Sequence, residues 1–183
     1  MNEATATQPP TAVASGTELT RPGARRTLPL GVRHALLTAH IVMSVGLLGD
    51  SAGYLAVAVR TSTIDDPSLV HDAAKTLNMF SLVFGIPLSF GALLTGIALG
   101  IGTRWGVFRY PWVTAKLALI VSVLLVGGLV LAPASSRLLD GDTGATGPLI
   151  AGATYDVVAL TLATVLAVYK PGRTFRRIRD ARR

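Results

Sequence analysis

Four long apolar stretches, separated by shorter polar segments, form the pattern of this sequence. The stretches cover residues 35–59, 77–101, 112–131 and 149–169. Each is close to the ~20 apolar residues that an α-helix needs to cross the ~30 Å hydrocarbon core of a bilayer. Because lipid offers no hydrogen bonds to the backbone, apolar segments of this length are expected to be helices. The pattern predicts an all-α fold, a four-helix transmembrane bundle with up-down-up-down topology.

The segments around these stretches divide the chain into three parts. Residues 1–30 are rich in Ala, Thr, Pro and Gly and have no apolar periodicity, which is typical of a disordered tail. Residues 31–172 form the predicted transmembrane domain, and residues 173–183 form a basic tail. The chain is therefore expected to hold one membrane domain between two polar tails.

Prolines mark the expected bends and ends of the helices. Asp66 is expected to cap a helix that begins at Pro67, outside the membrane, and runs into the second stretch. Pro87 lies inside that stretch, and the loss of one backbone donor there predicts a kink between Gly85 and Pro87. Pro133 is expected to end the third stretch.

The composition supports a membrane domain and excludes several kinds of site. Of the 183 residues, 50% are hydrophobic and 15% are charged, and the apolar residues are concentrated in runs. The chain has no cysteine, which excludes disulfides, iron–sulfur clusters and thiolate zinc sites. The formal net charge is +7, but the basic residues flank apolar stretches, so the expected partner is the lipid bilayer and not nucleic acid.

The distribution of Lys and Arg predicts the orientation. Of the 17 Lys and Arg residues, thirteen lie in the two terminal flanks and the loop between the second and third stretches, and three lie in the other two loops. The positive-inside rule then places both termini in the cytoplasm. The basic tail is expected to lie on anionic lipid headgroups. The bias toward Ala, Gly, Val and Arg indicates a multi-pass protein of an actinobacterial cell membrane.

Two pairs of ionisable residues inside the stretches are expected to form two layers. His40 and Lys116 share a level near the cytoplasmic ends of the first and third stretches, whereas Asp50 and Asp156 share a level in the outer half of the first and fourth. Lys116 has an alternative role as an interfacial anchor, and His40 as a neutral imidazole bonded to a neighbouring helix.

The acidic layer is the stronger candidate for function. The first and last helices of an up-down bundle are usually neighbours, which would bring Asp50 and Asp156 together. Two carboxylates in a low dielectric are expected to share a proton or hold a cation. Tyr54 and Tyr155 could supply hydroxyl donors to this layer.

Glycines four residues apart predict close packing of the first two helices. Such pairs let helix backbones approach each other within a bundle or between copies of the chain, so they also admit a homo-oligomer. The pairs are Gly49 with Gly53 and Gly96 with Gly100.

Three motifs carry a resemblance to a known family. The segments AHIVMSVGLLGDSAGY, PWVTAKLAL and YDVVALTLATVLAVYKPGR resemble the small four-span bacterial integral membrane proteins of domain-of-unknown-function family 2269. The resemblance covers residues 32–173. It implies the same four-span fold and leaves the activity open.

A more distant resemblance implies a haem site. His40 in the first stretch and the Trp112-x-x-x-Lys116 motif are similar to the arrangement in copper-resistance D-type proteins and haem-binding membrane protoporphyrinogen oxidases. On that resemblance His40 would be the haem ligand. A second intramembrane His is absent, since His34 lies at the boundary and His71 in an outer loop, which leaves a penta-coordinate haem or a non-haem site.

These observations leave three classes of function open. One is a membrane protein that handles a ligand, a proton or a cation through its intramembrane Asp, His and Lys side chains. The second is a haem-associated or redox membrane protein. The third is a structural subunit of a larger membrane complex.

Overall fold

The computed structural model describes residues 29–102 and 111–169, and every secondary-structure element within these ranges is helical. Three predicted segments lie outside the described residues: the N-terminal tail except its last two residues, the basic C-terminal tail, and most of the loop between the second and third stretches. The elements are α1 (Leu30–Thr61), α2 (Pro67–Phe80), a first π-helical segment (Ser81–Gly85), α3 (Ile86–Gly102), α4 (Pro111–Val126), a second π-helical segment (Gly127–Leu131), α5 (Ala132–Leu139), a short 3-10 turn (Thr143–Ala145) and α6 (Thr146–Tyr169).

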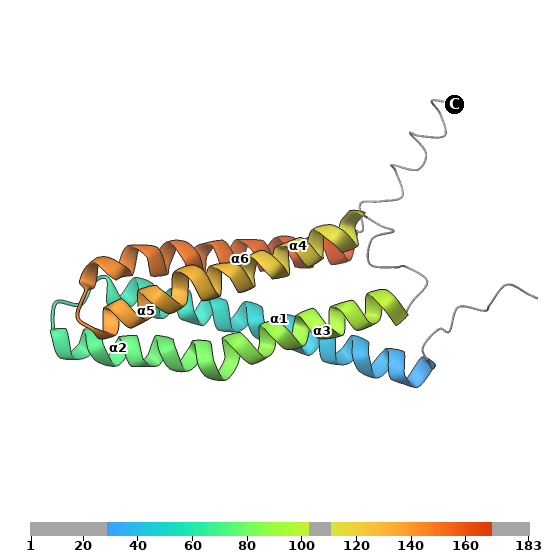
Figure 1. The fold of residues 1–183 in the computed structure, drawn as a ribbon, viewed down its shortest axis with the longest axis horizontal. Helices are drawn as coiled ribbons and strands as arrows, with labels where there is room; N and C mark the ends of the chain where they lie inside the picture. The colour runs from blue at the N-terminus through green and yellow to red at the C-terminus, as the bar shows by residue number, and fades with distance from the viewer. Residues whose placement is uncertain (1–28, 103–110, 170–183) are drawn as a thin grey trace, which may run out of the picture.

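These elements make four long rods that lie lengthwise beside each other (Figure 1). The second rod runs from α2 through the first π segment to α3, and the third runs from α4 through the second π segment to α5. α1 packs against α3 and α6, and α4 packs against α6 and α3, so the expected contact between first and last helices is confirmed. We call the end with the two short connections the loop end, and the opposite end, where α1 begins and α6 ends, the terminal end.

Local sequence sets the start of α2 as predicted. The Asp66 carboxylate accepts hydrogen bonds from the Ser68 backbone N–H at 2.8 Å and the Ser68 hydroxyl at 2.7 Å, and Pro67 occupies the first helical position. These hydrogen bonds, the hydroxyl first, hold the pKa of Asp66 below its ordinary value because they stabilise the carboxylate.

The second and third rods have a proline far from their ends, Pro87 and Pro133, and each contains a π segment shortly before this proline. The Ile86 N–H bonds to the Ser81 carbonyl and the Ala132 N–H to the Gly127 carbonyl, both five residues back. The expectation that Pro133 ends the third stretch is wrong as far as the helix is concerned, because the helix continues to Leu139. A π turn changes the hydrogen-bond spacing just before the proline, where the ring would otherwise clash with a backbone carbonyl, so the helix continues through it.

The core is concentrated at the loop end. The three largest fully buried side chains, Leu77, Leu138 and Leu149, lie there, and a smaller cluster around Leu47 and Leu160 follows toward the middle. Among the described residues, no side chain of α1 before Leu47 or of α6 after Leu160 is buried. Figure 1 shows the rods diverging in this direction, α1 and α3 from α4 and α6. The bundle is therefore tightest at the loop end and most open at the terminal end.

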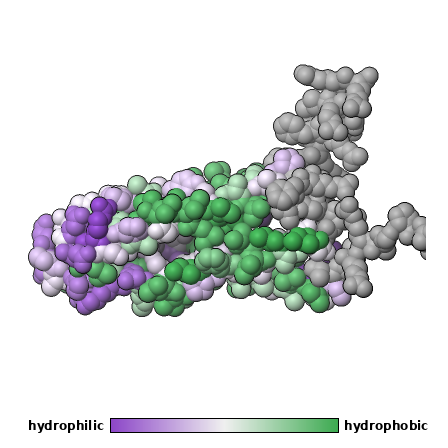
Figure 2. Space-filling view, in the orientation of Figure 1, coloured by the Kyte–Doolittle hydropathy of each residue, from purple (hydrophilic) through white to green (hydrophobic). Residues whose placement is uncertain are grey.

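The surface divides along the long axis. Apolar side chains cover the middle of the face seen in Figure 2, and hydrophilic ones gather at the loop end. All four rods are long and apolar enough to cross a membrane. The rod from Pro67 to Gly102 has 36 residues, which at 1.5 Å per residue is about 54 Å and exceeds the ~30 Å hydrocarbon core. An exposed apolar surface of this extent fits a polytopic membrane protein.

Candidate functional site

Two helices, α1 and α6, carry a cluster of buried acidic and phenolic side chains next to the core of the loop end. α1 carries Asp50 and Tyr54 one turn apart, and α6 carries Asp156. Tyr54 and Asp156 are only 3% and 5% exposed. Asp50 is half-buried as a residue, but its Oδ1 atom is fully buried. We call these three residues the acidic cluster.

The cluster holds polar atoms without hydrogen-bond partners. Within residues 29–102 and 111–169, three buried side-chain polar atoms lack a partner, and they are Oδ1 of Asp50, Oδ1 of Asp156 and the hydroxyl of Tyr54. Both carboxyl groups act electrostatically on Tyr54, which ties the three into one site. The Ser81 hydroxyl lies near the Tyr54 hydroxyl but does not reach hydrogen-bonding geometry. Buried polar groups are nearly always hydrogen bonded, so three exceptions in one place need an explanation.

The helices that carry the acidic cluster pack against both interruptions of the neighbouring rods. Oδ2 of Asp50 is 3.3 Å from the position that a Cβ atom would take at Gly85, so this glycine lets the carboxyl group lie against the first π segment. One turn before Asp156, Gly152 packs against the second π segment, since a Cβ there would be 2.7 Å from Leu131 Cδ2. Single-turn π segments are frequent at functional sites.

The sequence predicts that Asp50 and Asp156 share a proton or hold a cation. Their Oδ1 atoms have no hydrogen-bond partner in the described part of the chain. Tyr54 lies one turn from Asp50 on α1, and both carboxyl groups act on it electrostatically. A shared proton or cation stays a prediction, with Tyr54 as the intermediate.

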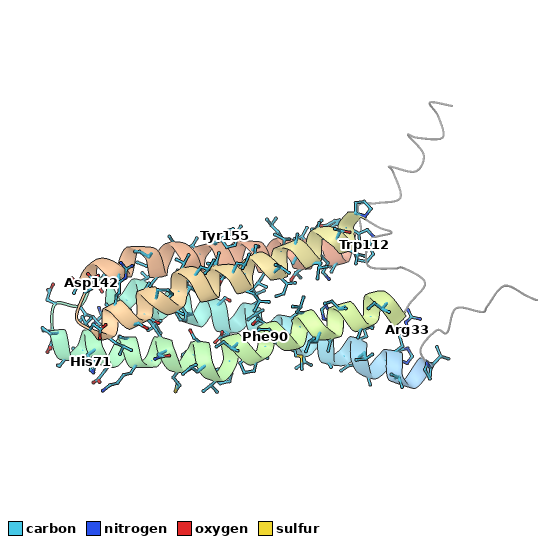
Figure 3. All side chains as sticks on the ribbon, viewed as in Figure 1. Arg33, His71, Phe90, Trp112, Asp142 and Tyr155 are labelled. Atoms are coloured by element: carbon cyan, nitrogen blue, oxygen red, sulfur yellow. The ribbon has the colours of Figure 1, made fainter. Side chains whose placement is uncertain are left out.

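Tyr155 does not join the cluster in the structure. It is 42% exposed, and its hydroxyl donates a hydrogen bond to the Ser122 hydroxyl at 2.7 Å. Figure 3 labels it midway along α6. Its contact therefore joins α6 to α4 at the surface.

The basic pair occupies a second level nearer the terminal end. His40 Nδ1 is 3.0 Å from the Thr95 hydroxyl oxygen, and that hydroxyl donates to the Gly91 carbonyl at 2.6 Å. Since the hydroxyl proton is used there, Nδ1–H of the imidazole is the donor to Thr95. Lys116 acts electrostatically on His40, so α4 contributes to the same level. Ten residues of α1 separate His40 from Asp50, about 15 Å along the axis.

The glycine pairs are placed differently from one another. A Cβ at Gly53 would meet the Phe80 ring at 3.1 Å, and one at Gly96 would meet the His40 ring at 3.1 Å. Gly100 is buried. Gly49 is exposed, and no described atom lies within 4 Å of its Cβ position. Gly53 and Gly96 thus make room for side chains, and self-association through the Gly49 face stays a prediction.

The side chains offer little for a metal or haem. No group of three or more His, Cys, Asp or Glu residues that could hold a metal ion exists among the residues that the structure describes. Because His40 Nδ1 is used toward Thr95, its Nε2 is the one ring nitrogen left to coordinate a haem iron. On the haem resemblance, His40 would be the residue of these two helices that holds the group through Nε2.

Sequence reasoning missed the partners of the predicted residues. Thr95, Ser81 and Gly85 were not among the candidates. Depth would have found Thr95, because it lies about as far from the end of the second stretch as His40 does from the start of the first.

Comparison with known proteins does not assign the chain to a family. No family model matches the chain, and no curated protein or solved structure is detectably similar to it. Fold and composition define the class, a protein with four helices that can cross a membrane. The resemblance to domain-of-unknown-function family 2269 stays a prediction.

Proposed function

We propose that this chain is a multi-pass protein of the cell membrane, with both termini in the cytoplasm, that handles protons through Asp50, Tyr54 and Asp156. The observation that carries the proposal is the concentration of unpartnered buried polar atoms in these three residues. The wider bundle supports it, because the cluster lies next to the tightly packed loop end and is thereby kept from bulk water.

The physical argument concerns charge. An ionised carboxylate in a low-dielectric site without a donor or a counter-charge is strongly unfavourable. In the described part of the chain, the salt bridge found is that of Lys75 with Asp72 at the loop end, so neither cluster carboxylate has a cationic partner there. Asp50 and Asp156 are therefore expected to hold a proton or bind a cation.

Tyr54 is the expected connection between the two acids. A phenol both donates and accepts a hydrogen bond, so it can take a proton from one carboxyl group as it gives its own to the other. In this proposal Tyr54 acts as the relay, and Asp50 and Asp156 are the two sites where the proton resides. A monovalent cation is the alternative occupant, because two carboxylates and a phenol oxygen are hard ligands.

Infrared spectroscopy of the full chain in liposomes tests the proposal. The carbonyl stretch of protonated carboxylic acids is expected to persist at neutral pH and to weaken in both Asp50→Asn and Asp156→Asn. Asp65→Asn is the matched control, because Asp65 is an exposed residue of the loop end. Loss of the band on addition of Na⁺ or K⁺ would assign a cation as the competing occupant.

Two outcomes would count against the proposal. If all carboxyl groups titrate together as solvated acids, and neither Asn variant changes the band, the cluster holds no proton of its own. If Asp65→Asn changes the band as much as the other two variants, the signal comes from the loop end.

A further inference from the structure

We infer that His40 and Lys116 form a second site, which binds the phosphate of an anionic ligand at the terminal end of the bundle. This site is about 15 Å from the acidic cluster along α1, and it does not depend on the proposed proton chemistry. Its parts come from three rods, since His40 lies on α1, its partner Thr95 on α3 and Lys116 on α4.

The imidazole of His40 is held in one orientation. Its Nδ1–H is bonded to Thr95, and the Ala92 carbonyl lies near the ring. The ring lies against the backbone of α3, where Gly96 leaves room for it. With Nδ1 used toward α3, Nε2 is the nitrogen left for a ligand, and in the imidazolium form it is a donor.

Lys116 adds a charge that the described residues do not neutralise. Its ammonium group is half-buried and near enough to act on His40, yet no carboxylate forms an ion pair with it in the described part of the chain. Two potential cations at one level repel each other, and an anion between them removes this repulsion and supplies acceptors to both.

The terminal end suits an anion from outside the bundle. The rods diverge there (Figure 1). Neither α1 before Leu47 nor α6 after Leu160 buries a described side chain. Arg33 lies two turns before His40 on the same side of α1, and Figure 3 shows it at this end together with Trp112. α4 also begins here, and the N-terminus of a helix favours negative charge. Basic pockets between membrane helices typically take lipid phosphates.

The alternative role of Lys116 is that of a simple interfacial anchor, and a test must distinguish this role from a binding site. An anchoring lysine interacts with any headgroup, zwitterionic or anionic, and does not need His40. A built site prefers anionic phosphate and depends on both residues. Binding to several probes, with both residues varied, separates the two roles.

Native mass spectrometry of the full chain in detergent provides the measurement. The protein is titrated separately with phosphatidylglycerol, phosphatidylcholine and inorganic phosphate. We expect one phosphatidylglycerol to bind more tightly than phosphatidylcholine, and Lys116→Gln to weaken it about tenfold, the effect of losing one hydrogen bond to a charged group. His40→Phe is expected to weaken it as well, and Lys116→Arg to retain binding.

Lys75→Gln is the matched control, because it removes an exposed lysine at the loop end. Binding of inorganic phosphate with the same dependence on Lys116 would identify a free anion as the ligand, and binding of phosphatidylglycerol alone would identify a lipid headgroup. Equal binding of the two lipids, or equal binding by Lys116→Gln and Lys75→Gln, would overturn the inference. Retained binding by Lys116→Arg shows that a loss in Lys116→Gln does not come from misfolding.

Discussion

Replacing Tyr54 with Phe removes one hydroxyl from the acidic cluster and keeps the ring in the core. That hydroxyl is buried and has no hydrogen-bond partner among the described residues. A buried polar group without a partner costs about 1–3 kcal/mol. Tyr54→Phe is therefore expected to raise the free energy of unfolding by about 1–3 kcal/mol, although it removes the hydroxyl group of the proposed proton relay.

The expected change is large enough to measure by thermal unfolding. For a chain of this size, each kcal/mol corresponds to about 2–4 °C in Tm, so Tyr54→Phe is expected to raise Tm by about 2–12 °C. Circular dichroism of the full chain in detergent follows the loss of helix. The infrared carboxyl band, recorded on the same variant, is expected to respond more slowly to a pH jump, because the relay between the two acids is gone.

Tyr155→Phe is the matched control, since it is the same substitution on α6. The Tyr155 hydroxyl donates a hydrogen bond to Ser122, and losing such a bond costs about 0.5–1.5 kcal/mol. The two variants should therefore change Tm in opposite directions. If Tyr54→Phe lowers Tm as Tyr155→Phe does, the Tyr54 hydroxyl is satisfied in solution, and the argument from unpartnered atoms fails.

Three further predictions follow from the described contacts. Asp66→Ala is expected to lower Tm and Asp66→Asn to preserve it. Because hydrogen bonds from Ser68 lower the pKa of Asp66, the stabilisation by this cap is complete above the ordinary carboxyl pKa and is lost as the pH falls through the lower folded-state value. The Asn variant should therefore lose this pH dependence of Tm. Gly152→Ala is expected to be about 1–3 kcal/mol less stable than Gly49→Ala by thermal unfolding. The reason is that a Cβ at Gly152 overlaps a buried leucine, whereas one at Gly49 meets no described atom. Equal stabilities of the two variants would contradict the packing. A reporter fused to the C-terminus should be active only in the cytoplasm, and one inserted near Asp142 only outside, while the reverse pattern would overturn the orientation.

The elements of this fold could be predicted where local chemistry decides them. Four apolar stretches of sufficient length predict four rods, and an Asp-Pro pair followed by Ser predicts the cap of α2 without any knowledge of packing. Depth is also predictable, because residues are counted from the ends of a stretch. The level shared by His40 and Lys116 follows from such a count, and the electrostatic effect of Lys116 on His40 agrees with it.

The direction in which a side chain points could not be predicted in the same way. A helix that faces lipid is apolar on all sides, so the periodicity that reveals the buried face of a soluble helix is weak. Tyr155 is adjacent to Asp156 in sequence, yet its hydroxyl bonds to Ser122 and lies outside the cluster. The prediction for Pro133 was wrong for a related reason. A π segment can accommodate a proline inside an apolar helix, and whether it does so depends on packing against the neighbouring rods.

The free-energy cost of its unpartnered polar atoms makes the acidic cluster the strongest candidate for a functional site. Three unpartnered polar atoms at about 1–3 kcal/mol each amount to about 3–9 kcal/mol, comparable with the 5–15 kcal/mol that stabilises a typical folded protein. Apolar side chains of similar volume would avoid this cost, and exposed positions along the same helices already carry them. The Asp50 carboxyl group also lies against the first π segment, where the helical hydrogen-bond pattern is interrupted. A change in the charge of Asp50 therefore acts on a segment where the backbone has alternative hydrogen bonds, and through it on the packing of α1 against the second rod.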